Sequence, residues 1–134
     1  MNAVLVAFVA LLTLAAPALA VGFQQVVVPD PDDTSLEVAV WYPSNDAVSP
    51  QPIGPFFTQT VAIGGGVDGK ALPLVVISHG AGASSFAHYD TALALAEAGF
   101  VVAAIQHTGD NYKDGSKFIR AAVDRPRHVN RTLD

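Results

Sequence analysis

The strongest constraint on the fold is a pair of apolar segments separated by a helical one. Leu72–Ser78 reads LPLVVIS and Phe100–Ile105 reads FVVAAI. Strands that are buried on both faces have this composition and lie in the middle of parallel sheets. The residues between them recur at helical spacing, on a face made of Phe86, Tyr89, Leu93 and Ala96. The pattern predicts a strand–helix–strand unit with parallel strands and a right-handed crossover.

The ends of the predicted helix carry stop and start signals. Ser84 or Ser85 suits the N-cap, because a hydroxyl oxygen can accept a backbone N–H of the first turn. Gly99 follows the last apolar position and suits the C′ residue, where glycine adopts the left-handed conformation without strain. We therefore expect the helix to lie between these signals.

Two strands are predicted upstream. Phe23–Val28 is a short apolar run, and Ser35–Tyr42 alternates between apolar and other residues as a half-buried strand does. Asp30–Asp33 reads DPDD, a turn composition, so the two strands form an antiparallel pair. Pro43–Pro55 is rich in Pro, Ser and Asn and predicts a loop, the least ordered part of the chain after the N-terminal segment. Phe56–Ile63 predicts a short strand or hairpin arm.

The C-terminal third predicts a loop followed by a helix. Gln106–Lys117 is polar. Asp124–Asp134 has apolar residues four apart, and Pro126 is expected at the first helical position, where its missing N–H has no cost. The predicted elements together define an α/β class of fold, with an antiparallel strand pair followed by a parallel βαβ unit.

The first twenty residues have the features of an export signal. Residues 1–20 hold a short apolar run, then Pro17, and end in Ala18-Leu19-Ala20, a small-x-small cleavage pattern. The run is too short to span a bilayer. We expect a signal peptide at 1–20, one domain at 21–134, a secreted or periplasmic location, and no stable membrane span after cleavage. The alternatives are an N-terminal anchor or a buried helix.

Composition excludes several classes of function. The net charge is −5, which argues against nucleic acid, because binding phosphates takes clustered Lys and Arg. The chain has no cysteine, so thiolate metal sites and Cys nucleophiles are excluded. The four histidines, His79, His88, His107 and His128, show no paired ligand spacing, and no metal site is predicted.

Four stretches in order carry a family resemblance. They are LEVAVWYPS (Leu36–Ser44), LPLVVISHGAG (Leu72–Gly82), LAEAGFVVAAIQHTG (Leu95–Gly109) and RPRHVNRTLD (Arg125–Asp134). With these segments the chain resembles the predicted dienelactone hydrolases and platelet-activating-factor acetylhydrolase-like esterases of the α/β-hydrolase superfamily. The resemblance implies the N-terminal part of an α/β-hydrolase sheet, hydrolysis of small-molecule carboxylic esters or lactones, and no cofactor.

The resemblance also implies roles for single residues. Ala81 occupies the position whose amide forms half of the oxyanion hole, and His79 and Gly80 shape that turn. For the His79 side chain, a structural role that orients the backbone is favoured over proton transfer. His107 ends the next strand and is expected near the same turn, either as a site residue or as an ordinary loop histidine. The Gly54–Gly66 loop is expected to help wall the substrate pocket.

The sequence departs from the family pattern at the nucleophile. The elbow G-x-S-x-G does not occur in the 134 residues. A local triad of Ser84, His88 and Asp90 is disfavoured, because residues two apart point to different faces of a helix. We expect a fragment that lacks the catalytic triad, is inactive alone and, with an unpaired apolar sheet edge, is poorly soluble. The alternative is a non-catalytic exported binding module; a complete small enzyme is disfavoured.

Overall fold

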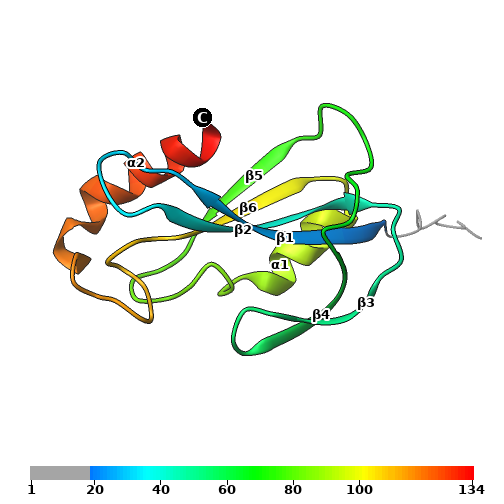
Figure 1. Ribbon diagram of the computed structural model, residues 1–134, viewed down its shortest axis with the longest axis horizontal. Coiled ribbons are helices and arrows are strands. Elements are labelled where there is room, and N and C mark those ends of the chain that lie inside the picture. The colour runs from blue at the N-terminus through cyan, green and yellow to red at the C-terminus, as the bar shows by residue number, and fades with distance from the viewer. Residues whose placement is uncertain (1–18) are drawn as a thin grey trace, which may run out of the picture.

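The computed structural model describes residues 19–134, so the predicted signal segment lies outside the described residues except for Leu19 and Ala20. Six strands form one twisted sheet in the order β3-β4-β1-β2-β6-β5 (Figure 1). The strands are β1 (Ala20–Val28), β2 (Leu36–Ser44), β3 (Ser49–Ile53), β4 (Phe57–Ile63), β5 (Leu74–Ser78) and β6 (Val101–Gln106). The helices are α1 (Tyr89–Glu97), the short 3₁₀ helix η1 (Phe118–Arg120) and α2 (Ala121–Leu133).

The mixed α/β architecture agrees with the predicted one. β1 and β2 pair antiparallel over their whole length, from Ala20 opposite Ser44 to Val28 opposite Leu36. β5 and β6 pair parallel, with α1 between them in the chain. β2 lies beside β6 and joins the antiparallel pair to the parallel pair. The predicted strand pair and βαβ unit are therefore both present in one sheet.

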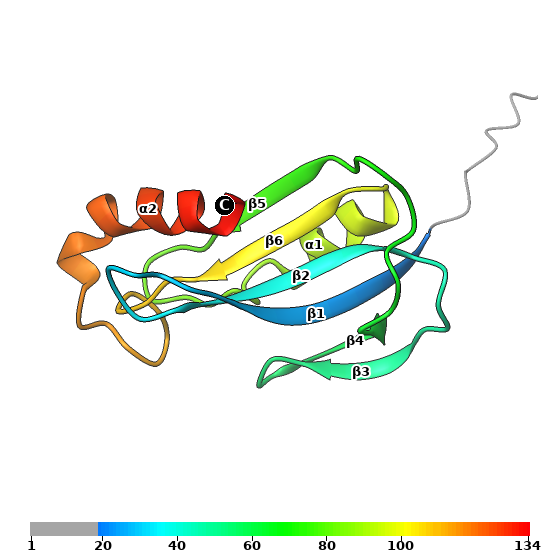
Figure 2. The ribbon, with the colours of Figure 1, turned by 45° about the horizontal axis from the view of Figure 1, so that its top comes forward.

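The prediction that Ser35–Tyr42 is half-buried is wrong. Leu36 and Val38 of β2 are buried on one face, and Ala39 and Trp41 are buried on the other. β2 lies between two other strands, and each face of the sheet is covered by a helix (Figure 2). The alternating residues of β2 therefore face two different apolar clusters and not one core and one solvent-exposed face.

The prediction of a loop over Pro43–Pro55 is also wrong, because β3 lies within it. β3 reads SPQPI and pairs antiparallel with β4. Pro50 and Pro52 are two residues apart, so both ring nitrogens face the same side of the strand. Proline is tolerated where that side is the free edge of a sheet, since no N–H is needed there. The prolines therefore define an edge strand and not a loop.

The prediction that β5 is buried on both faces in the middle of a sheet is also wrong. In the described chain β5 is the outermost strand beside β6, and its residues are half-buried or exposed. Leu74 is 47% exposed. An unprotected apolar strand at an edge exposes backbone donors and acceptors that can pair with a further strand.

α1 is shorter than its sequence signals suggest. The residue before it is His88, and no side chain caps the helix, so the predicted Ser84 or Ser85 N-cap is wrong. The Ser84 hydroxyl instead accepts the Phe86 N–H at 3.2 Å in the turn that precedes the helix. The C-terminal signal is confirmed. Gly99 has φ +97°, and the N–H groups of Gly99 and Phe100 bond back to Ala96 and Leu95 as in a Schellman motif.

α2 begins five residues before Pro126, which the sequence predicted to be the first helical residue. It starts at Ala121 directly after η1, and Pro126 lies inside it. Alanine favours the helix strongly enough at Ala121 and Ala122 to start it upstream of the proline. Pro126 then leaves the Ala122 carbonyl without its usual intrahelical donor. No helix among residues 19–134 is long and apolar enough to cross a membrane.

Candidate active site

The segment after β5 forms a tight turn at the carboxyl end of the strand. His79 is buried, whereas Gly80 and Ala81 are exposed. Gly82 has φ +63°, a conformation that favours glycine, and the Ala83 N–H bonds to the Gly80 carbonyl at 3.2 Å. Sites in open α/β sheets lie at the carboxyl ends of the strands, so this turn is well placed for chemistry.

The His79 side chain holds backbone on both sides. Its Nε2 accepts the backbone N–H of His107 at 3.2 Å, which leaves Nδ1 protonated to donate to the Gly80 carbonyl at 2.7 Å. Burial lowers the pKa of His79, and the charge of Arg125 adds to that effect. A neutral imidazole that bridges the turn to the end of β6 is suited to orienting backbone.

His107 and His128 lie against each other behind the turn. Their Nδ1 atoms are 3.0 Å apart, and their rings stack with centroids separated by 5.3 Å. The His79 ring contacts His107 from the other side, with centroids 4.8 Å apart. All three histidines are at most 1% exposed. This cluster was not predicted from the sequence, because its members lie in three separate segments and share no local spacing.

The tautomers of His107 and His128 follow from their contact with Arg127. Arg127 can only donate, and its Nη2 lies 3.4 Å from His128 Nε2, which must accept. His128 Nδ1 then carries the proton and donates to His107 Nδ1. His107 Nε2 in turn carries its proton and donates to the Ser78 hydroxyl oxygen at 2.7 Å. The assignment rests on the hydrogen-bond network.

This chain of bonds does not make Ser78 an activated nucleophile. A general base must accept the serine proton, whereas His107 Nε2 already donates to that oxygen. Burial, followed by the neighbouring His79 and Arg125, lowers the pKa of His107 to about 3, so its ring is a weak base near neutral pH. The orienting group is a neutral His128 and not a carboxylate, so nothing stabilises an imidazolium. The contact between Ser78 and His107 is therefore structural.

Two residues that the sequence analysis did not weigh, Asp110 and Arg125, meet at the turn. The guanidinium of Arg125 binds the Asp110 carboxylate and also donates to the His79 carbonyl. Burial opposes the ionisation of Asp110, but the Gly82 N–H and Arg125 hold the pKa of its carboxyl below the usual value. The sequence carried a weak signal for Arg125, which begins the last of the four family-like stretches, whereas Asp110 lies directly after the third stretch, which ends at Gly109.

The other predicted site residues do not converge. Asp90 accepts the N–H of Thr91, and the Ser84 hydroxyl accepts the N–H of Phe86, so neither supports His88. The rejection of a local triad is consistent with these contacts. Within residues 19–134, no group of three His, Cys, Asp or Glu side chains is arranged to hold a metal ion.

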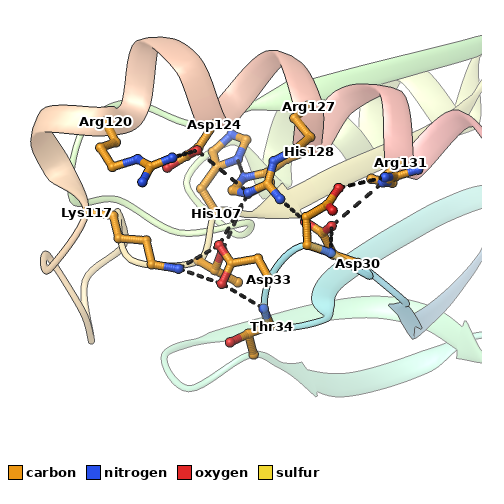
Figure 3. Close-up of polar contacts among 12 residues, drawn as sticks. Asp30, Asp33, Thr34, His107, Lys117, Arg120, Asp124, Arg127, His128 and Arg131 are labelled. Atoms are coloured by element: carbon orange, nitrogen blue, oxygen red, sulfur yellow. Dashed lines mark hydrogen bonds and ion pairs between the residues drawn. The ribbon is translucent and has the colours of Figure 1, made fainter.

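An ion-pair network joins the β1–β2 turn to α2 (Figure 3). Arg127 lies 3.0 Å from a carboxylate oxygen of the buried Asp30 and 3.3 Å from one of Asp33. Lys117 donates to both oxygens of Asp33, and this bond, with the Thr34 N–H, lowers the Asp33 pKa to about 2. Arg131 extends the network to Asp30 and Asp32. The network fixes α2, whose Arg125 reaches the turn.

Two cavities lie near this end of the sheet. One of about 450 Å³ is bounded by Ala81 and by residues of η1 and α2, namely Phe118, Ala121, Ala122, Arg125 and Pro126, together with Asp110. Another, of about 750 Å³, lies between the β3–β4 turn and the loop after β6, and its lining includes Gly54, Pro55, Phe86 and Tyr112. None of His79, Gly80, Ala81 or His107 lines the larger cavity. The smaller one is the better candidate for bond cleavage, because Ala81 of the exposed turn lines it.

Comparison with known proteins identifies the family. Residues 62–128, half of the chain, match the family described as platelet-activating factor acetylhydrolase, isoform II. The chain belongs to this family, which is one of α/β-hydrolase-like esterases. The match contains β5, the turn, β6 and most of α2.

A solved structure supports the same fold. A ferulic acid esterase from Streptomyces cinnamoneus superposes with a TM-score of 0.55 at 26% sequence identity. The alignment covers 72% of this chain and 36% of the esterase chain, so the present chain corresponds to about a third of that protein. A comparison with curated protein sequences finds no match.

Proposed function

We propose that this chain is the N-terminal part of an exported serine hydrolase that cleaves carboxylic esters or small lactones, including those of dienelactone type. In this proposal residues 1–20 are a cleaved signal peptide and the rest is the first portion of the hydrolase domain. Family membership supports ester hydrolysis as the class of reaction. The particular acyl and alcohol groups depend on residues outside this chain.

One observation carries the proposal: a free pair of amides at the turn after β5. Within residues 19–134 no hydrogen-bond partner is found for the N–H groups of Gly80 and Ala81, and both residues are exposed. Attack on an ester carbonyl produces an oxyanion, which preorganised N–H groups stabilise. The Ala81 N–H is proposed to supply one of these donors, as the family pattern implies.

The proposal assigns the nucleophile to a longer chain. No G-x-S-x-G occurs in the 134 residues, and the chain covers 36% of the related esterase. The exposed edge of β5 also suits pairing with a further strand. The remaining histidine candidate, His107, is proposed to support the turn and not to transfer protons, because both of its ring nitrogens are engaged.

The test has a genetic and a biochemical part. The DNA downstream of codon 134 is sequenced; an in-frame G-x-S-x-G supports the proposal, and an immediate natural stop codon favours the alternative, an exported binding module. The 134-residue chain is assayed on a nitrophenyl acyl ester, where we expect no turnover above background. Turnover that a serine-directed phosphonate inhibits would contradict the absence of a nucleophile in this chain. N-terminal sequencing of the exported product tests cleavage after Ala20.

A further inference from the structure

Arg125 reaches from α2 to the turn and makes three hydrogen bonds there. Its Nη1 donates to the His79 carbonyl at 2.5 Å. Its Nε and Nη2 donate to one oxygen of Asp110, Oδ2, at 2.9 and 2.6 Å. The planar guanidinium can make these bonds in two directions at once, which a lysine ammonium on a single stem cannot reproduce.

Asp110 completes the contact from the loop after β6. Its carboxylate is buried, and its other oxygen, Oδ1, accepts the Gly82 N–H at 3.1 Å. Arg125 therefore binds the His79 carbonyl, which precedes the exposed residues Gly80 and Ala81. Asp110 binds the Gly82 N–H, which follows them. Because Arg125 and Asp110 also bind each other, both ends of the segment His79–Gly82 are tied to one ion pair.

The bonds inside the segment leave a particular pair of donors. The Gly80 carbonyl is taken by the His79 ring and by the Ala83 N–H, and the Gly82 N–H by Asp110. Among the described residues, only the N–H groups of Gly80 and Ala81 have no hydrogen-bond partner between Gly80 and Ala83. Ala81, Arg125 and Asp110 line the same cavity of about 450 Å³.

We propose that Arg125 and Asp110 are positioning residues that hold the segment His79–Gly82 with its Gly80 and Ala81 amides ready to receive an oxyanion. This inference rests on the proposed function of the turn. The pair carries no net charge, so it acts by fixing donor direction and not by attracting the anion. Donors aligned in advance need no reorganisation when charge develops, which is the source of their effect.

A role only in docking α2 does not account for these contacts. α2 is already attached to the β1–β2 turn through Arg127 and Arg131, which pair with Asp30, Asp32 and Asp33. Val129 adds an apolar contact with the sheet. Arg125 is the residue of the helix whose bonds go to the turn and to the loop that supports it.

The test uses the 134-residue chain and NMR. Arg125→Lys keeps the positive charge but loses the two-directional bonding, and Asp110→Asn keeps the shape but removes the charge. Arg131→Lys is the matched control, because Arg131 lies on the same helix and forms ion pairs away from the turn. Amide hydrogen exchange is measured at the turn and at the core strands β2 and β6. Acetate, a carboxylate oxyanion, is titrated while the Gly80 and Ala81 resonances are followed.

We expect saturable acetate shifts at Gly80 and Ala81 in the wild type, weakened roughly tenfold or more in Arg125→Lys and Asp110→Asn and unchanged in Arg131→Lys. Exchange of the Gly82 N–H should accelerate in the first two variants, with β2 and β6 unchanged. Equal acetate binding in all four proteins would overturn the positioning role and leave the proposed function standing. No acetate shift in the wild type, with Gly82 exchange still faster in the variants, would instead overturn the oxyanion role of the turn.

Discussion

The two faces of the sheet are stabilised by different physical means. On the α1 face, aromatic side chains pack into a continuous apolar core, with Trp41 in contact with Phe23 and Phe86 at centroid distances of 4.9 and 6.2 Å. On the α2 face the apolar cluster is small, formed by Leu36, Val38, Ala103 and Ile105. Beside that cluster lie the buried histidines and the ion pairs of Figure 3.

The difference separates apolar packing on one face of the sheet from titratable groups on the other. Burial of apolar surface is insensitive to pH and changes little with salt, so the α1 face supplies a rigid support. Buried imidazoles and ion pairs depend on protonation and on ionic strength. The turn of the candidate site lies against the second group through His79 and Arg125. Perturbations of the two faces should therefore have distinguishable signatures.

The largest expected effect is on the α1 face. Trp41→Ala removes a fully buried ring and leaves the Gln59 side-chain oxygen without the indole donor that lies 2.8 Å away. We expect a loss of about 3–5 kcal/mol in the free energy of unfolding, the usual range for such cavities. Urea unfolding measures it, with Val27→Ala on the exposed side of β1 as the control. The loss should be the same at pH 7.5 and pH 5; a strong pH dependence would contradict the comparison.

A smaller effect is expected from acid on the α2 face. The pKa of His107 falls from 6.5 to about 3 in the folded chain, so below pH 6.5 the unfolded state binds a proton that the folded state excludes. Stability should therefore fall as the pH drops through 6.5 and continue to fall toward about 3. At pH 5 the protonation of His107 in the unfolded state lowers the free energy of unfolding by about 2 kcal/mol. His79 and His128, whose pKa values are also lowered, reduce the stability in the same direction.

His107→Gln tests this origin, because an amide can still bond to Ser78 but does not titrate. The variant should lose less stability than the wild type between pH 7.5 and pH 5 in urea unfolding. His88→Gln serves as the control, since His88 is exposed at the start of α1. An identical pH slope in wild type and His107→Gln would show that the acid sensitivity of the α2 face has another source.

The smallest effect is expected at the rim of the ion-pair network. Asp33→Asn removes the partner of Lys117, whose side chain is 36% exposed, so solvent screens the pair. We expect a loss of less than about 1 kcal/mol at neutral pH, reduced further in 1 M salt. Thermal unfolding at low and high salt measures it, with Glu37→Gln as a control outside any ion pair found within residues 19–134. If the loss in stability did not depend on salt, the Asp33–Lys117 pair would behave as a buried ion pair and not as a solvent-screened one.

The sequence predicted the local elements with uneven success. The apolar runs of β5 and β6 and the Gly99 stop signal identified the βαβ unit, because period and glycine conformation act over a few residues. The prolines of β3 misled the prediction, since a proline pattern does not say whether a strand has a neighbour on its other side. Pro126 also led to a wrong helix start, because the residues before it already form a helix and outweigh the preference of proline for the first helical position.

The candidate site was predicted only in part. The turn residues His79, Gly80 and Ala81 were predicted from a short motif that resembles a family; they lie directly after β5, and their catalytic role stays a prediction. Asp110, Arg125 and His128 were not identified, although they complete the surroundings of the turn. They are separated from it by 28 to 49 residues of chain. The parallel pairing of β5 with β6 brings Asp110 to the turn, and the packing of α2 against the sheet brings Arg125 and His128 there.

The sequence alone determined which segments become strands and helices around the turn and which small residues occupy it, because these depend on side-chain period and backbone freedom. The tertiary structure decided which strand lies at an edge, which three histidines share one buried cluster, and which arginine holds the turn. Those outcomes depend on partners distant in the chain. A residue's burial, its pKa and its hydrogen bonds are properties of such neighbours and not of its own segment.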